Sequence, residues 1–396
     1  MCFINITMNI GIVCYPTFGG SGVVATELGK ALAQKGHKVH FISYSQPVRL
    51  DSFSENIFYH EVSVSNYPLF DYQPYELVLA SKLVDVSIFE NLDLLHVHYA
   101  IPHASAAYMA QQILASKGWR VPFITTLHGT DITLVGKDAS FEPVITFAIS
   151  QSNAITSVSE SLKRDTYKHF GVRKPIHVIP NFICIEDYTK LRAKIGEQEI
   201  EKHKKYYAPN KEKIMIHISN FRRVKRLEDV LKVFEKVRKE VPVKLLLLGD
   251  GPERPNIERM CRELDVCNDV RLLGKVVNPD DYLLFSDLFL LPSETESFGL
   301  AALEAMASRV PVISSNTGGI PEVNLHGFSG FLSQVGDVED MAKNAVFILN
   351  NPEILQKFRK QAFEQALTFD IHKILPMYEK LYDEVVKENA TIETNK

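Results

Sequence analysis

Two glutamates, Glu296 and Glu304, are the side chains whose type and spacing best suit the recognition of a sugar. Seven residues separate them, after an apolar run at 288–291 that predicts a buried strand. A carboxylate accepts hydrogen bonds from two neighbouring hydroxyls, so each glutamate can hold the diol of a ribose or a hexose. The small apolar residues between them predict a helix from about Phe298, with Glu296 in the loop before it. A chance pair is disfavoured because Glu304 would then face inward without a partner.

A group of cations follows the first predicted strand of the second half. Segment 219–226 holds Arg222, Arg223, Lys225 and Arg226 at the point where a helix is expected to begin. Cations there oppose the helix dipole unless an anion lies among them, which favours a diphosphate-binding role over solvated side chains at a helix start.

A glycine-rich loop, Gly19-Gly20-Ser21-Gly22, precedes a helical pattern at 23–34. Glycines let the backbone approach an anion while the helix start presents free N–H groups, although a tight turn without a ligand is the alternative. The order of the glycines differs from the dinucleotide fingerprint, and no acidic residue ends the strand predicted at 38–43. A dinucleotide cofactor is therefore disfavoured.

Histidines are also candidates. His128 ends a predicted strand at 122–127 and could bind a sugar hydroxyl, although a lone histidine is more often structural. His96, His98 and His103 resemble a metal cluster, but strand alternation places the first two on one face without a nearby cysteine or clear carboxylate. We therefore expect no metal site.

Strands alternating with helical patterns must position these residues. Six β-rich runs lie between residues 9 and 179 and six more between 214 and 332, which predicts an α/β protein with two Rossmann-like domains of parallel strands. The polar stretch at 180–213 marks the boundary between them. Ligands of open α/β sheets bind beyond the carboxyl ends of the strands, so two such domains facing across a cleft would suit group transfer.

The bulk composition limits the function classes. A chain of 396 residues exceeds the usual size of one core, and a net charge of −4 gives no general attraction to nucleic acid or anionic lipid. No apolar run approaches the ~20 residues of a membrane span. The first seven residues look like an extension rather than a signal peptide, and the five scattered cysteines suggest reduced thiols. We expect a soluble cytoplasmic protein.

Taken together, the glycine-rich loop, His128, Lys225, the turn at 249–253 and the two glutamates resemble the family-4 retaining GT-B glycosyltransferases. Four segments are similar to those members that transfer N-acetylglucosamine from its UDP donor to L-malate at the start of bacillithiol synthesis. They are 11–16, 96–103, 126–133 and 218–222.

The resemblance implies two domains, 1–182 for the acceptor and 183–370 for the donor, with a C-terminal helix at 371–396 packing back on the first. It implies catalytic roles for His128, Lys225 and Glu296. The implied donor-binding residues are Gly19, Gly20, Gly22, Asn220, Arg222, Lys225, Glu296, Phe298, Gly299, Leu300 and Glu304, and the implied acceptor-binding residues are Ser21, Tyr99 and Thr126.

Two positions depart from the family's pattern. Many members carry arginine where Asn220 stands, and the malate-specific members carry arginine in the segment that matches 144–148, where this chain has Thr146. Lys163 or Arg164 could supply the missing cation.

The leading hypothesis is transfer of N-acetylglucosamine from UDP-N-acetylglucosamine to L-malate with retention of configuration. The family suggests no carboxylate nucleophile, and the sequence has no Asp-x-Asp motif in a suitable position, so we expect neither a metal ion nor another cofactor. The alternatives are another acceptor (inositol phosphate, a sugar or a lipid), a UDP-N-acetylglucosamine 2-epimerase, and a binding protein without catalysis. No nucleic-acid partner and no stable membrane association are expected, and self-association stays open.

Overall fold

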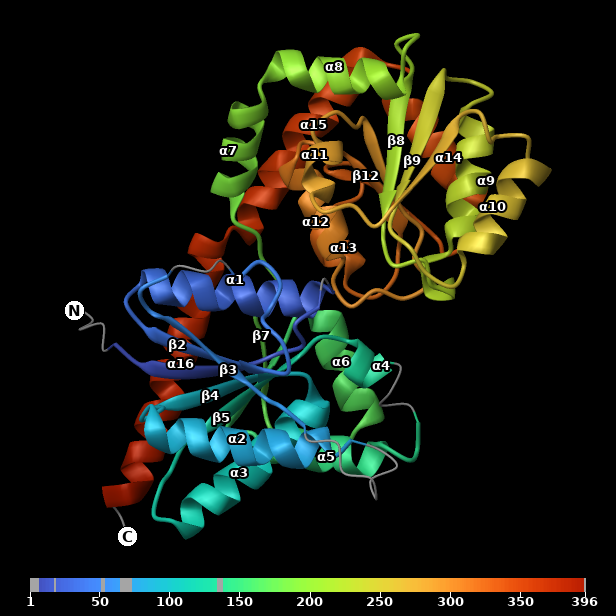
Figure 1. The fold of residues 1–396 in the computed structure, drawn as a ribbon. Coiled ribbons are helices and arrows are strands. Elements are labelled where there is room, and N and C mark those ends of the chain that lie inside the picture. The colour runs from blue at the N-terminus through green and yellow to red at the C-terminus, as the bar shows by residue number, and fades with distance from the viewer. Residues whose placement is uncertain (1–6, 18, 51–53, 65–72, 134–137, 395–396) are drawn as a thin grey trace. The chain divides into compact units, whose positions relative to one another are not determined.

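The computed structural model describes the chain apart from residues 1–6, 18, 51–53, 65–72, 134–137 and 395–396 (Figure 1). Contacts divide the chain into two units, and the C-terminal segment belongs to the first. The N-terminal unit comprises Met1–Phe182 and Ile371–Lys396, and the C-terminal unit comprises Ile183–Asp370. Most of the expected N-terminal extension lies outside the described residues.

The N-terminal unit is built on seven parallel strands in the order β3-β2-β1-β4-β5-β6-β7. The strands are β1 (Asn9–Val13), β2 (Lys38–Ser43), β3 (Ile57–Glu61), β4 (Leu94–His98), β5 (Phe123–Leu127), β6 (Ala154–Ser157) and β7 (Ile176–Val178). The helices are α1 (Gly20–Gln34), α2 (Tyr75–Phe89), η1 (Ala100–Ala104), α3 (Ser105–Ser116), α4 (Thr130–Thr133), α5 (Glu142–Gln151), α6 (Glu160–His169) and α16 (Ile371–Thr394). The six strands expected from the sequence are present, and the edge strand β3 is additional.

Helices cover both faces of this sheet, which explains why its central strands are buried on both sides (Figure 1). On one face, α2 and α3 pack on Leu95, Val97 and Phe123. On the other, α1 lies so close that a Cβ added to Gly29 would be 2.3 Å from the Phe41 ring. A glycine is therefore required where α1 crosses the sheet.

The helix α16 closes the N-terminal unit. It contacts α1, and the buried hydroxyl of Tyr382 is 2.6 Å from His96 Nδ1. The side-chain amide of Asn389 donates to the carbonyl of Arg120, 269 residues away in the chain. The helix continues to Thr394, past the polar residues that follow Val386.

The C-terminal unit has six parallel strands in the order β10-β9-β8-β11-β12-β13. The strands are β8 (Lys213–Ile218), β9 (Val243–Leu248), β10 (Val270–Gly274), β11 (Leu288–Leu291), β12 (Val312–Ser315) and β13 (Gly330–Ser333). The helices are α7 (Ile185–Ile195), α8 (Glu197–Tyr207), η3 (Arg223–Lys225), α9 (Leu227–Val237), α10 (Arg254–Glu263), α11 (Pro279–Leu283), α12 (Leu300–Ala307), α13 (Ile320–Val323), α14 (Val338–Leu349), α15 (Pro352–Ala366) and η4 (Leu367–Phe369). The polar stretch expected at the boundary forms the two helices α7 and α8.

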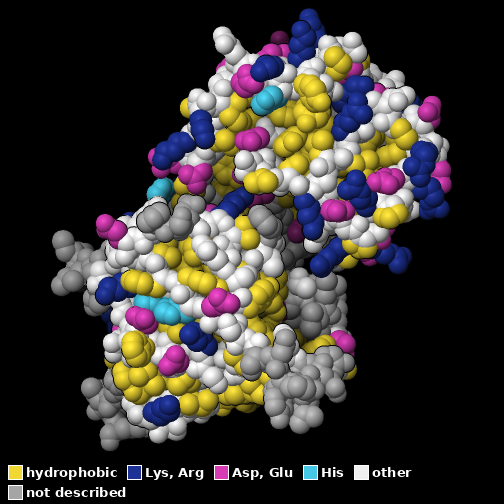
Figure 2. Space-filling view, viewed as in Figure 1, with side chains coloured by type: hydrophobic (Ala, Val, Ile, Leu, Met, Phe, Trp, Pro, Cys, Tyr) yellow, Lys and Arg dark blue, Asp and Glu magenta, His cyan; other side chains and the backbone are white. Residues whose placement is uncertain are grey.

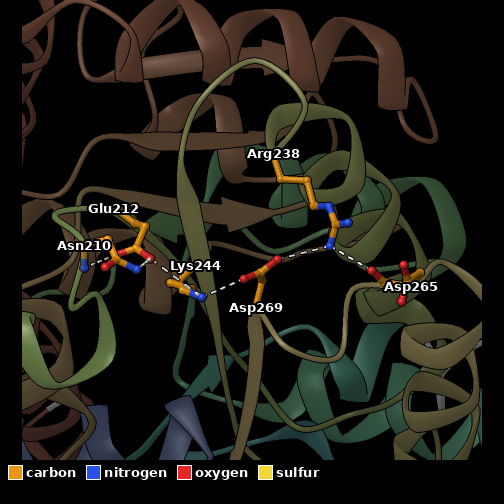
Figure 3. Close-up of polar contacts among 6 residues, drawn as sticks. All are labelled: Asn210, Glu212, Arg238, Lys244, Asp265 and Asp269. Carbon is orange, nitrogen blue, oxygen red and sulfur yellow. Dashed lines mark hydrogen bonds and ion pairs between the residues drawn. The ribbon is translucent and has the colours of Figure 1, made fainter.

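The amino ends of these strands carry a network of charged side chains (Figure 3). Lys244 Nζ, on β9, lies 2.6 Å from Asp269 Oδ1 and 3.8 Å from Glu212 Oε1. Arg238 donates to the other oxygen of Asp269 and to the carbonyl of Asp265. These pairs join the segments just before β8, β9 and β10, so ion pairs stabilise the amino edge of the sheet. The opposite, carboxyl edge remains available to ligands.

Asp287, the residue before β11, makes the most buried ion pairs of this edge. Its side chain is 2% exposed and accepts hydrogen bonds from Lys204 Nζ at 2.8 Å, Arg359 Nη2 at 2.7 Å and the backbone N–H of Ile214 at 2.8 Å. One carboxylate thus holds α8, α15 and β8 to the start of β11.

Replacing Asp287 with asparagine is expected to destabilise the C-terminal unit by about 2–4 kcal/mol, because two cations lose their partner in a site with little access to water. Urea unfolding followed by circular dichroism measures the change. The matched control is Glu186→Gln, which removes an exposed pair with Lys190 and should leave the transition unchanged. Equal midpoints for the two variants would contradict the role given to Asp287.

No helix in the described part of the chain is long and apolar enough to cross a membrane. The four cysteines within that part, Cys14, Cys184, Cys261 and Cys267, form no disulfide with one another.

Candidate active site

The strand order of the C-terminal unit creates a switch point between β8 and β11. The chain proceeds from β8 outward to β10, then returns and proceeds from β11 outward to β13. The loops that leave β8 and β11 therefore diverge at the carboxyl edge, which is where open α/β sheets bind ligands. The first loop carries Lys225 and the second carries Glu296.

Lys225 and Glu296 meet at this switch point. Lys225 Nζ lies 2.6 Å from Glu296 Oε2, and both side chains are partly exposed, at 19% and 17%. A partly exposed lysine can exchange its carboxylate partner for another anion. The carboxylate can then accept hydrogen bonds from the hydroxyl groups of a ligand. The pair thus offers one cation and one acceptor to a ligand.

Close backbone contacts fix the loop that carries Glu296. A Cβ added to Gly318, which has φ +55°, would lie 1.9 Å from the carbonyl oxygen of Glu296, and one on Gly319 would lie 2.2 Å from that of Ser297. The N–H of Gly319 also donates to the carbonyl of Glu296 at 2.9 Å. The turn at 316–319 therefore needs glycines because the backbone of the Glu296 loop packs directly against it.

The loop that carries Lys225 is held by its neighbours on both sides. The N–H of Phe221 donates to the carbonyl of Asp250 at 2.9 Å, and the N–H of Glu294 donates to that of Val224 at 2.8 Å. A Cβ on Gly249, at φ +124°, would lie 1.8 Å from the carbonyl oxygen of Ser219. The loops after β9, β8, β11 and β12, which are neighbours along the carboxyl edge, thus contact one another around the Lys225–Glu296 pair.

The other residues predicted to bind the donor lie along these same loops. Asn220 and Arg222 are exposed in the loop after β8, and Glu304 is half-buried on α12. The helix α12 begins at Leu300, two residues later than expected, because Gly299 before it has a left-handed backbone with φ +99°. Phe298 is buried against Phe369, with ring centroids 5.6 Å apart.

The N-terminal unit has its own switch point, between β1 and β4. The glycine-rich loop follows β1, and Tyr99 follows β4. The hydroxyl of Ser21 lies 3.4 Å from that of Tyr99, and the ring of Tyr99 meets that of Tyr15 edge to face at 5.3 Å. A Cβ on Gly22 would lie 2.5 Å from the carbonyl oxygens of both Tyr15 and Thr17, so this glycine allows the close turn.

Tyr99 is held in an uncommon backbone conformation, with φ +89°. Its N–H donates to the carbonyl of Thr126 at 3.0 Å, while the next N–H, of Ala100, donates to Asp131 Oδ2 at 3.1 Å. Such strain persists where the surroundings over-determine it, and it is concentrated at functional sites. The hydroxyl of Thr126 itself is buried against His96 and Thr156, at 2.6 Å from each, so its backbone rather than its side chain adjoins Tyr99.

Four buried histidines lie behind Tyr99. His98 Nδ1 is 2.8 Å from His128 Nε2, and the rings of His96 and His98 are 4.4 Å apart. His103 Nδ1 donates to the carbonyl of His98. Burial lowers the pKa of His96 and His128 to about 3 and that of His103 to about 4, and it lowers the pKa of His98 well below 6.5. The network is therefore neutral at neutral pH, and His128 can exchange hydrogen bonds without carrying charge.

Asp131 is a positioning residue that the sequence reasoning passed over. Besides Ala100, the N–H of Gly129 donates to it at 2.9 Å, so one buried carboxylate ties the loop after β4 to the loop after β5. Burial raises its pKa to about 6, against these backbone donors. In the sequence, the only indication of this role is that Asp131 closely follows the end of a predicted strand.

The positions that depart from the family's pattern are also visible. Thr146, on α5, donates to Glu142 Oε1 at 2.7 Å, so this helix carries an internal hydrogen bond where a cation was expected. Of the two cations suggested as substitutes, Lys163 pairs with Glu160 at 3.5 Å, and Arg164 is exposed on the same helix, α6.

Comparison with known proteins assigns both units. A sequence model described as Glycosyltransferase Family 4 matches residues 18–187, and one described as Glycosyl transferases group 1 matches residues 198–365. Among solved structures, Anabaena HepE in complex with UDP and glucose superposes with a TM-score of 0.80 at 18% identity, covering 95% of this chain and 99% of its own. Sucrose-phosphate synthase from Thermosynechococcus elongatus gives a TM-score of 0.78 at 18% identity, covering 96% and 100%. The fold is that of GT-B glycosyltransferases.

A relative with much higher identity narrows the assignment. N-acetyl-alpha-D-glucosaminyl L-malate synthase of Bacillus anthracis is 46% identical over 383 residues, which are 96% of this chain and 98% of that protein. The chain therefore belongs to the family-4 GT-B glycosyltransferases and is a glycosyltransferase, as the resemblance in its motifs implied.

Proposed function

We propose that this protein transfers N-acetylglucosamine from UDP-N-acetylglucosamine to the hydroxyl of L-malate, with retention at the anomeric carbon, as the first step of bacillithiol synthesis. The observation that carries the proposal is the 46% identity with the malate synthase over nearly the whole of both chains. Identity of this extent, without a large insertion or deletion, favours a shared acceptor as well as a shared fold.

The donor is assigned to the loops around the Lys225–Glu296 pair. Lys225, with Asn220 and Arg222, neutralises the diphosphate. Glu296 accepts from hydroxyls of the transferred sugar, supported by the backbone of Phe298, Gly299 and Leu300. Glu304 accepts from the ribose hydroxyls of uridine.

The acceptor is assigned to the residues around Tyr99 in the N-terminal unit. The hydroxyls of Ser21 and Tyr99, already 3.4 Å apart, bind malate, and the backbone of Thr126 positions Tyr99. His128 binds a hydroxyl of the donor sugar in its neutral form, since burial lowers its pKa to about 3. Lys163 or Arg164 supplies the positive charge that a dicarboxylate requires.

The reaction is assigned to charge stabilisation and positioning. The departing diphosphate removes the proton of the malate hydroxyl on the same face on which the new glycosidic bond forms, so configuration is retained without a carboxylate nucleophile. Lys225 stabilises the negative charge that develops on the leaving group. No metal ion takes part in this scheme, and activity should persist in EDTA.

The experiment that tests the proposal measures UDP release from UDP-N-acetylglucosamine with L-malate, inositol phosphate, simple sugars or no acceptor. Release that depends on malate, with an α-linked product by NMR, is expected. Release with another acceptor in the panel would transfer the assignment to that acceptor. Conversion of the sugar without any acceptor would indicate an epimerase, and UDP binding by calorimetry without release would indicate a binding protein.

The acceptor assignment makes a separate prediction for Tyr99→Phe. Loss of the hydroxyl should raise the KM for malate about tenfold, the cost of one hydrogen bond to a charged group, while the KM for the donor stays unchanged. Phenylalanine and tyrosine have the same backbone preferences, so the strained conformation at this position should not distinguish the variant from the wild type. Steady-state kinetics with each substrate varied in turn measures the effect, and Tyr206→Phe, at an exposed position of α8, is the control. A rise in the donor KM alone would contradict the acceptor role.

A further inference from the structure

Two histidines and a glutamate lie together at the edge of the N-terminal sheet, apart from the residues assigned to the reaction. They are His40 on β2, His60 on the edge strand β3, and Glu90 directly after α2. One ligand atom from each lies within 4.8 Å of the other two. In the part of the chain that the structure describes, this is the one group of at least three histidine, cysteine or acidic side chains with such spacing.

The nitrogen atoms of the two histidines are as close as two ligands of one metal ion. His40 Nδ1 lies 3.0 Å from His60 Nε2. Bonds of about 2.0–2.1 Å to a tetrahedral zinc ion place neighbouring ligand atoms roughly 3.3 Å apart. Glu90, whose ligand oxygen lies within 4.8 Å of both histidine ligand nitrogens, would supply a third corner of a tetrahedron and leave the fourth to water.

The surroundings hold this group in place. The ring of His40 is buried and stacks on Phe58 at 4.7 Å with an interplanar angle of 15°. The backbone of Glu90 is fixed from both sides, since its N–H donates to the carbonyl of Val86 and its own carbonyl accepts from the side chain of Asn9. Ligands that are positioned before binding lose little conformational freedom when a metal arrives.

A hydrogen bond between the two rings is the alternative to a shared metal ion. His40 Nε2 is buried and has no hydrogen-bond partner among the described residues, and this holds for both arrangements, so it does not separate them. What favours a metal ion is the third group, Glu90, whose ligand oxygen lies within 4.8 Å of the ligand nitrogens of both histidines and which a hydrogen bond between two neutral rings does not require. Figure 2 shows a histidine patch on the surface of this unit. His40 is buried, whereas His60 and Glu90 are partly exposed, so an ion would reach the group from their side.

We propose that His40, His60 and Glu90 bind a zinc ion that clips the edge strand β3 to β2 and to the end of α2. Two imidazoles and one carboxylate with an open fourth position are an established zinc ligand set. The site departs from the expectation of no metal drawn from the sequence. Closed structural zinc sites have four protein ligands, whereas three ligands here leave the fourth position to water. The ion would act by tying the edge strand β3, which has ladder partners on one side only, to β2 and to the end of α2.

Zinc binding to the full-length chain, without an affinity tag and after chelator treatment in a reducing phosphine buffer, tests the proposal. Zinc chloride is titrated against a chromophoric chelator. The wild-type protein should bind one tight equivalent, which His60→Gln should abolish and Glu90→Gln should weaken at least tenfold. The matched control is His203→Gln, which removes an exposed histidine 3.6 Å from Glu199 and should retain the tight equivalent.

Unfolding provides a second readout that distinguishes a specific site from zinc bound elsewhere. Saturating zinc should raise the midpoint of thermal unfolding by about 2–5 °C in the wild type and in His203→Gln, but not in His60→Gln. If circular dichroism shows that His60→Gln is unfolded, Glu90→Gln decides, since it keeps the shape of the side chain. Equal zinc affinity in the wild type and Glu90→Gln, or no tight equivalent in the wild type, would overturn the proposal.

Discussion

Replacing Lys225 with alanine is expected to lower kcat by about 10²–10³, the usual cost of removing one preorganised group that stabilises charge in the transition state. The fold should be retained, because the side chains of Lys225 and of its ion-pair partner Glu296 are both partly exposed, at 19% and 17%. UDP release under saturating substrates measures kcat, and thermal unfolding checks the fold. The control is Lys232→Ala, an exposed lysine of α9 whose loss should leave kcat unchanged.

The contact of Lys225 with Glu296 raises the question of whether the lysine acts on the donor or only positions the glutamate. A double-mutant cycle separates the two roles. If Lys225 neutralises the diphosphate, its replacement by alanine in a Glu296→Gln background should still lower kcat by more than tenfold. If it only orients the Glu296 carboxylate, the second substitution should have no further effect, and the proposed catalytic role would be wrong.

The sequence predicted most of the fold, because parallel strands covered on both faces are apolar along their whole length. Five of the six residues of β9 are apolar, for example, and such runs need no tertiary information to be recognised. The strand β3 escaped this reasoning because it is an edge strand with half-exposed residues, of which Phe58 is 38% exposed. Buried and exposed residues do not alternate clearly along β3, so its sequence lacks the pattern that identifies a strand.

The sequence could assign Lys225 and Glu296 to strand ends but could not bring them together. Seventy-one positions separate them in the chain, and their 2.6 Å contact depends on β8 and β11 being neighbours at a switch point. Strand order follows from how the whole sheet packs, which local patterns do not encode. The roles of these residues in binding therefore remain predictions, while their proximity is a property of the fold.

The same limit applies to His40, His60 and Glu90. In the sequence, the histidines that resemble a metal cluster are His96, His98 and His103, because they lie close together in the chain. The group with ligand spacing instead combines residues 20 and 50 positions apart, joined only by the pairing of β2 with β3 and the return of α2. Histidines near in sequence on one strand face became a buried network instead.

That buried network predicts that the N-terminal unit loses stability steeply in mild acid. In the unfolded chain histidines have pKa values near 6.5, whereas in the folded unit the pKa of His96, His98, His103 and His128 is lowered by burial. Above pH 6.5 both states are neutral, so nothing is lost. As the pH falls below 6.5 the unfolded chain takes up protons that the folded unit cannot, and each histidine costs about 1.4 kcal/mol per pH unit.

Asp131 opposes this trend in part. Burial raises its pKa from 3.8 to about 6, so the folded unit takes up a proton between pH 6 and pH 4 that the unfolded chain does not yet bind. This proton uptake stabilises the folded unit by about 1 kcal/mol at pH 5.5. The four histidines together destabilise it by more than that. The net loss from these five groups between pH 7 and pH 5.5 should be roughly 3–5 kcal/mol. Burial also lowers the pKa of His40 and His60 in the same unit, so they act in the same direction.

Trp119 makes the measurement specific, because it is the single tryptophan of the chain and belongs to the N-terminal unit. Urea unfolding followed by its fluorescence at pH 7, 6.5, 6 and 5.5 gives the slope of stability with pH. His96→Gln keeps polar atoms opposite Tyr382 and Thr126 but removes one titrating ring, so its slope should be shallower whatever its stability at pH 7. His177→Gln, at an exposed position of β7, should keep the wild-type slope. An unchanged slope in His96→Gln would mean that His96 takes up a proton as readily in the folded unit as in the unfolded chain, because only a difference between the two states makes stability depend on pH.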